Sequence, residues 1–178
     1  MKMTHIKTPQ LPSGIEDFAE MRLSRLFPEG EPLAIADKTG FLPNILDFFG
    51  DLMVFTRPIR FMKSSTLSMI DRFISIGDAE ANRTLFDGLA INDEAYADFR
   101  AQYQGQFPVI LLTLKNIKAD TWSEAKKEFS DIIADLYEKH SYVLNALKER
   151  QKDKYQRLLN GEGEYSDLKN SLAELSSY

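Results

Sequence analysis

The segment that most constrains the fold is an apolar run that a proline ends, followed by a basic turn and an amphipathic stretch. Leu52 to Thr56 are apolar or β-branched, and Pro58 follows them, which is the pattern of a short buried strand. Residues 63–76 then repeat apolar side chains at helical spacing. These are Leu67, Ile70, Phe73 and Ile74. The stretch therefore predicts a strand, a tight basic turn, and a helix that packs one face on a sheet.

A second apolar run, FPVILLTLKNI at 107–117, lies between a helical pattern at 93–104 and a longer one after it. Strands that alternate with helices favour a parallel sheet. We therefore expect an α/β fold with few, mostly parallel strands and a predominantly helical C-terminal half. The 178 residues are expected to form one domain, with an α/β part at 1–118 and a helical part at 119–178.

Helix starts and stops are readable at several other places. Ser13 and Glu16 suggest a start at the N-terminal side, and Thr39 to Phe49 forms a second apolar stretch. Thr121 followed by Glu124 predicts a capping box, and an apolar stripe continues to about Leu147. The sequence NGEGE is a helix stop, after which Ser166 is the expected cap of a last helix.

Composition excludes several functional classes. The formal charge of −5 disfavours nucleic acid as a partner, except through a local patch. There is no cysteine, and His5 and His140 are not spaced as a ligand pair, so no metal site is expected. The N-terminus lacks the apolar stretch of a signal peptide, and no run is long enough to cross a bilayer. We expect a cytoplasmic protein without a membrane partner.

The basic turn has the layout of a loop that binds phosphate at the start of a helix. In G-x-x-x-x-G-K-[ST], Lys63 would reach the β- and γ-phosphates and Ser64 would bind Mg²⁺. Arg57 and Met62 occupy the two glycine positions. If the second position needs a positive φ, the Cβ of Met62 costs on the order of 1–2 kcal/mol. By motif alone, a turn whose basic side chains are merely solvated is the more probable interpretation.

The order and spacing of several motifs resemble the AAA-ATPase-like family of the type found in Bacteroidetes and Fusobacteria. The similar segments are LPSGIEDF (11–18), ADKTGFL (36–42), VFTRPIRFMKSSTLSMI (54–70), LFDGLAI (85–91), FPVILLTLKNIKADTWSEA (107–125), LYEKH (136–140) and NGEGEYSDLKNSLAELSSY (160–178). The resemblance implies a partial P-loop-type sheet. It also raises the question of whether Asp37 and Lys38 approach the nucleotide, although a local role at the start of a helix is favoured for Asp37.

Departures from the family pattern bear on catalysis. The family loop resembles R-P-R-R-F-G-K-[ST], so Ile59 replaces an arginine and Met62 replaces the glycine. Family members continue into a strand with an acidic Walker B motif and often into a restriction-endonuclease-like domain, and neither is expected in this chain. ATP hydrolysis is therefore expected to be absent, since it needs both phosphate and metal held in place.

The leading hypothesis is a non-catalytic binding or regulatory protein that acts through protein–protein interaction or self-association. A phage or mobile-element inhibitor of a host defence nuclease of the CRISPR type (an anti-CRISPR protein) is one concrete version of it. The alternative is a residual nucleotide binder that uses ATP and Mg²⁺ without efficient hydrolysis. The vestigial phosphate-binding residues are Arg57, Arg60, Lys63 and Ser64. The candidate partner-binding residues are Arg57, Arg60, Phe61, Lys148, Arg150, Lys152 and Lys154.

Overall fold

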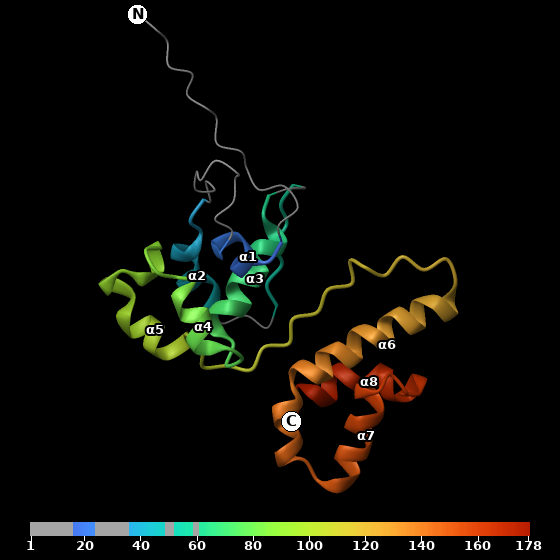
Figure 1. Cartoon of the computed structure of the whole chain (residues 1–178). Helices are drawn as coiled ribbons and strands as arrows, with labels where there is room; N and C mark the ends of the chain where they lie inside the picture. Colours follow the sequence, from blue (N-terminus) through green and yellow to red (C-terminus); the bar gives the residue numbers. More distant parts are fainter. Residues whose placement is uncertain (1–15, 24–35, 49–51, 59–60) are drawn as a thin grey trace, which may run out of the picture. The chain divides into compact units, whose positions relative to one another are not determined.

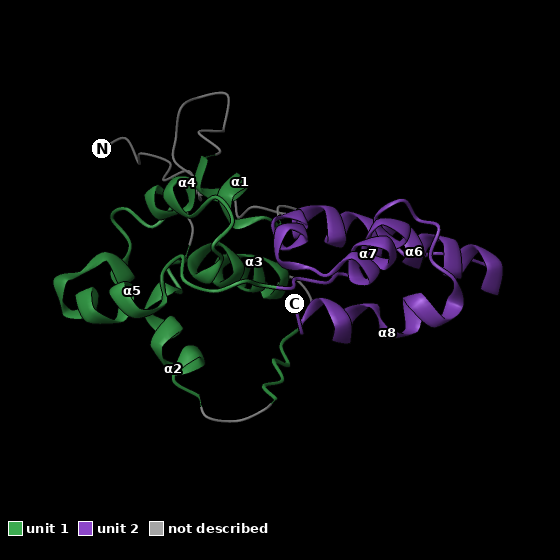
Figure 2. Cartoon of the chain, turned by 90° about the horizontal axis from the view of Figure 1, so that it is seen from below, with its two compact units in different colours: residues 1–109 green, residues 110–178 purple. Residues whose placement is uncertain are grey.

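The computed structural model describes residues 16–23, 36–48, 52–58 and 61–178. Within these ranges every regular element is a helix (Figure 1). The chain divides into two compact units, residues 1–109 and 110–178, which Figure 2 distinguishes by colour. Each unit has its own cluster of buried apolar side chains.

Unit 1 consists of short helices around one longer helix. The elements are α1 (Phe18–Leu23), a 3₁₀ turn η1 (Thr39–Phe41), α2 (Leu42–Leu46), α3 (Lys63–Ile74), α4 (Ala79–Thr84), η2 (Ala90–Asn92), η3 (Glu94–Tyr96) and α5 (Ala97–Tyr103). The helix predicted over 63–76 from its apolar spacing is confirmed as α3, although it ends at Ile74.

The core of unit 1 is aromatic. Phe73 of α3 is fully buried and meets Phe86 edge-on, with ring centroids 5.2 Å apart. Phe18 of α1 lies 5.1 Å from the same Phe86 ring. Such ring pairs add about 0.5–1.5 kcal/mol each to the burial of the rings. Of the α3 face expected to pack on a sheet, Ile70, Phe73 and Ile74 therefore pack on helices and turns, while Leu67 is exposed.

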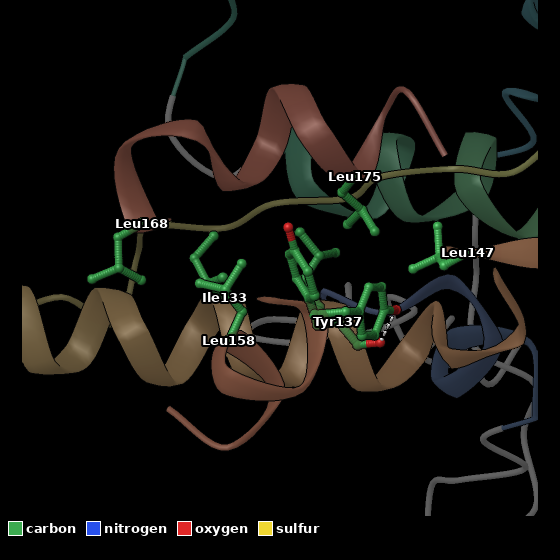
Figure 3. Close-up of a cluster of buried hydrophobic side chains, with 8 residues drawn as sticks. Ile133, Tyr137, Leu147, Leu158, Leu168 and Leu175 are labelled. Atoms are coloured by element: carbon green, nitrogen blue, oxygen red, sulfur yellow. Dashed lines mark hydrogen bonds between the residues drawn. The ribbon is translucent and has the colours of Figure 1, made fainter. Parts of the chain in front are cut away.

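Unit 2 consists of α6 (Trp122–Lys139), η4 (Ser141–Ala146), α7 (Glu149–Leu159) and α8 (Tyr165–Leu175). Its core gathers leucine, isoleucine and tyrosine side chains from all three α-helices (Figure 3). The two buried tyrosines keep their hydroxyls satisfied: Tyr155 donates to the carbonyl of Tyr137, and Tyr137 donates to that of Ser171. Burial raises the pKa of both hydroxyls, that of Tyr155 to about 12.

The prediction of a parallel sheet is wrong. The described residues hold no strand, only an isolated parallel bridge between Ser75 and Phe107. Residues 52–58 and 108–114 have no regular secondary structure, and Leu52 and Val54 are 78% and 70% exposed. An apolar run predicts a strand only if another strand pairs with it, and in the described chain the apolar helix faces bury one another instead.

Some of the helix ends were predicted correctly and others were not. The capping box of Thr121 and Glu124 is confirmed at the start of α6. The stop at NGEGE is confirmed too, with Gly161 at φ +70°. The cap of α8 is Glu164 rather than Ser166. Ser13 lies outside the described residues, and the stretch from Thr39 forms η1 and α2 only as far as Leu46.

Candidate functional site

The turn before α3 holds a left-handed residue at the position where a phosphate loop has its second glycine. Met62 has φ 58° and ψ 33° and immediately precedes Lys63, the first residue of α3. The backbone of Met62 therefore has the positive φ on which the predicted cost of its Cβ depends. A Cβ in this region costs on the order of 1–2 kcal/mol, a cost that glycine avoids.

The lysine of the turn binds the protein's own backbone. The ammonium of Lys63 donates to the carbonyl oxygens of Arg57 and Pro58, each at 2.9 Å. Thr66 donates to the carbonyl of Met62 through both its backbone N–H, at 2.9 Å, and its hydroxyl, at 2.7 Å. Lys63 and the start of α3 thus close the loop on itself. Ser64 is exposed in the first turn of the helix.

A second lysine reaches the same turn from a distant segment. Lys38 donates to the carbonyl of Phe61 at 3.2 Å, and its ammonium lies 5.2 Å from the centre of the Phe61 ring. Sequence reasoning left the position of Lys38 open, and the structure brings it to the loop. This second ammonium holds a further loop carbonyl.

Asp37 fixes the segment that carries Lys38. Its carboxylate accepts from the backbone N–H and hydroxyl of Thr39, at 2.8 and 2.7 Å, and from the N–H of Ala90 at 2.7 Å. Partial burial raises the pKa of Asp37, but these hydrogen bonds outweigh it and hold the pKa below the ordinary value. The expected local role of Asp37 is confirmed, and its bond to Ala90 adds a long-range tie.

The hollow beside the turn is small. Met62, Thr66 and Lys38 line it together with apolar side chains of α1 and α3. Its volume is about 20 Å³, which is room for about one water molecule. A phosphate group does not fit without movement of these side chains.

The other candidate residues fall into two groups, one in each unit. Arg57 and Phe61 are exposed, and Arg60 lies outside the described residues. In unit 2, Lys148 and Arg150 are exposed at the start of α7. Lys152 pairs with Glu149 at 2.9 Å.

Lys154 is held within unit 2. Its ammonium lies 2.5 Å from a carboxylate oxygen of Glu174 and 3.5 Å from one of Asp167. The hydrogen bond to Glu174 raises the pKa of Lys154. These contacts join α7 to α8, so Lys154 has a structural role within unit 2.

Sequence reasoning missed Arg22. Its guanidinium donates to the carbonyls of Leu85 and Asp87, each at 2.7 Å, and it lines the hollow beside the turn. A lone arginine on a short helix gives no sequence signal for such a contact. No group of three or more histidine, aspartate and glutamate side chains is placed to hold a metal within the described ranges.

Comparison with family models gives one finding: the model described as "Predicted AAA-ATPase" matches residues 12–174. Comparisons with curated proteins and with solved structures gave no match. Among the described helices, none is both long and apolar enough to span a membrane.

Proposed function

The chain belongs to the AAA-ATPase-like family, and from this premise we propose that it is a non-catalytic binding protein that acts through a protein partner. One observation carries the proposal: the ammonium of Lys63 is held by the carbonyls of Arg57 and Pro58. Phosphoryl transfer depends on a loop that holds phosphates and a metal in position. A loop whose lysine holds its own backbone, beside a left-handed Met62, is poorly suited to that task.

Exposed apolar side chains next to the loop support a protein as the partner. Leu52, Val54 and Phe61 are 78%, 70% and 53% exposed. Arg57, between them in sequence, is exposed as well. Exposed apolar surface bordered by polar groups is typical of protein interaction sites, and arginine and aromatic residues contribute most of the binding energy in such sites.

The partner test uses the purified chain as bait in a lysate of its host. We expect a stoichiometric partner that the wild type retains and the double variant Leu52→Ser, Val54→Ser loses. The matched control is Leu23→Ser, an equally exposed leucine of α1 at 69%. Recovery of no stoichiometric protein, or equal recovery by the double variant, would contradict the proposal. Inhibition of a purified guide-RNA nuclease by the chain tests the narrower hypothesis of an anti-CRISPR protein.

Residual nucleotide binding is the second candidate. Lys63 and Ser64 stand in the first turn of α3, a helix of 12 residues whose N-terminal end favours negative charge. For ATP to bind there, Lys63 would have to exchange two carbonyl oxygens for phosphate oxygens. Binding of ATP with Mg²⁺ that disappears in Lys63→Ala would favour this candidate over the first.

A further inference from the structure

A second concave site lies in unit 1 between the end of α4 and one face of α5. Arg83 of α4 lines it, together with Ala97, Arg100 and Ala101 of α5 and the two glutamines that follow, Gln104 and Gln106. The site is a shallow depression open to solvent, with a volume of about 280 Å³. The α5 residues and Gln104 are spaced as neighbours on one helical face, and the two alanines leave the space that the longer side chains surround.

The charged groups of the lining are both cationic. Arg100 is positioned by the backbone, because its Nη1 donates to the carbonyls of Ile91 and Asp93 at 2.7 and 2.6 Å. Arg83 pairs with Glu80 at 2.9 Å, with side chains 49% and 87% exposed. Such an exposed pair contributes little stability, so an incoming anion can replace Glu80 as the partner of Arg83.

The glutamines stand on a fixed turn. Gly105 lies between them at φ +70°, and its N–H donates to the carbonyl of Phe73 at 2.8 Å. After Gln106, the backbone N–H of Phe107 donates to the carbonyl of Ile74, the last residue of α3, and the carbonyl of Phe107 accepts from the N–H of Ile76. A Cβ added to Gly105 would come within 2.9 Å of the Cβ of Ala79. Backbone conformation and packing therefore both fix the place of Gln104 and Gln106.

We infer that this pocket binds a phosphate group. Two guanidinium groups match the charge of about −1.5 to −2 that a phosphate monoester carries at neutral pH, and guanidinium forms paired hydrogen bonds to its oxygens. The glutamine amides supply further donors. A single carboxylate would only replace Glu80 at Arg83, whereas a phosphate dianion has oxygens for Arg83 and also for the N–H groups of Arg100 other than those of Nη1, which donates to Ile91 and Asp93. The phosphate is either inorganic phosphate or the phosphate of a small monoester.

The test is an NMR titration of the full chain with inorganic phosphate, with adenosine monophosphate as the monoester and with acetate. We expect saturable shifts of the Arg83, Arg100 and Gln104 signals with phosphate at millimolar concentration, and no saturation with acetate. Tighter binding of adenosine monophosphate than of inorganic phosphate would identify a monoester as the ligand, and equal binding would identify phosphate alone.

Variants separate this site from the loop at 57–66. Arg83→Gln is expected to weaken phosphate binding by at least about tenfold. The matched control Arg150→Gln, an exposed arginine of α7, and Lys63→Ala are both expected to leave it unchanged. No saturation with phosphate, equal affinity for acetate, unchanged binding in Arg83→Gln, or loss in Lys63→Ala would each overturn the inference. Arg100 is left intact because it holds the backbone at 91–93.

Discussion

The ammonium nitrogen of Lys63 lies 2.9 Å from the carbonyl oxygen of Arg57, six positions earlier in the chain. The residue before this lysine, Met62, is held at φ 58°. Lys63 thus holds the loop together through its bonds to the backbone. This geometry leads us to treat the turn as a structural element that presents its neighbours for binding.

Met62→Gly is expected to stabilise unit 1. Glycine adopts the left-handed conformation without the Cβ cost of about 1–2 kcal/mol, and its larger entropy in the unfolded chain offsets part of that gain, which leaves up to about 1 kcal/mol. The free energy of unfolding, from urea denaturation followed by NMR signals of unit 1, measures the change.

The matched control for Met62→Gly is Ala81→Gly. Ala81 is exposed in the middle of α4 and has a helical backbone, so this change is expected to destabilise unit 1 by about 0.5–1 kcal/mol. A Met62→Gly variant that loses stability as the control does would show that the left-handed backbone carries no strain.

Asp37→Ala is expected to destabilise unit 1 by about 0.5–1.5 kcal/mol, since the N–H groups of Thr39 and Ala90 lose an acceptor that water can replace in part, because neither hydrogen bond is fully buried. The measurement is the same urea denaturation. Asp87→Ala is the comparison, because Asp87 is exposed and accepts from Arg22 through its backbone oxygen. Equal effects of the two changes would refute the role given to the Asp37 carboxylate.

Unit 1 is expected to lose stability in acid. Burial raises the pKa of Asp17, but the hydrogen bond from Glu20 and the ion pair with Arg72 outweigh it, so the pKa lies below its ordinary value of 3.8. The pKa of Asp37 is lowered too. A carboxyl whose pKa is lower in the folded state stabilises the fold above the unfolded pKa, and this contribution is lost as the pH falls through the folded pKa.

The acid effect is measured by urea denaturation at about pH 6 and about pH 3. In the double variant Asp17→Asn, Asp37→Asn, the difference in unfolding free energy between the two pH values should shrink. An undiminished difference would assign the acid sensitivity to other carboxyl groups.

Tyr155→Phe is expected to destabilise unit 2 by about 0.5–1.5 kcal/mol, because the carbonyl of Tyr137 loses its 2.6 Å hydrogen bond, although it keeps the N–H of His140 as a donor. Hydrogen exchange of α6 and α7 amides reports the change. The control is Tyr165→Phe, since Tyr165 is 59% exposed in α8. Faster exchange in the control than in Tyr155→Phe would contradict the expected importance of this bond.

Local patterns predicted helices well. The capping box at Thr121 and Glu124 involves residues three apart, and the bounds of α3 follow from side chains on one face of a single helix. Both depend on neighbours along the chain, which the sequence displays directly.

Long-range pairing could not be predicted in the same way. The apolar runs at 52–56 and 107–117 have strand composition, yet a strand needs a partner that composition does not specify. The contact of Lys38 with Phe61 spans 23 residues, and that of Arg22 with Leu85 spans 63. Such contacts depend on how helices pack. The sequence therefore predicted the order of residues in the loop, but not the contacts that Lys38 and Arg22 make.

Calorimetry of the full chain with ATP and Mg²⁺ tests the central claim most directly. We expect no saturable heat from the wild type and none from Lys63→Ala, since Lys63 is engaged by the carbonyls of Arg57 and Pro58. Binding of ATP to the wild type with a micromolar Kd that vanishes in Lys63→Ala would show that the loop still holds a nucleotide, and would contradict the account.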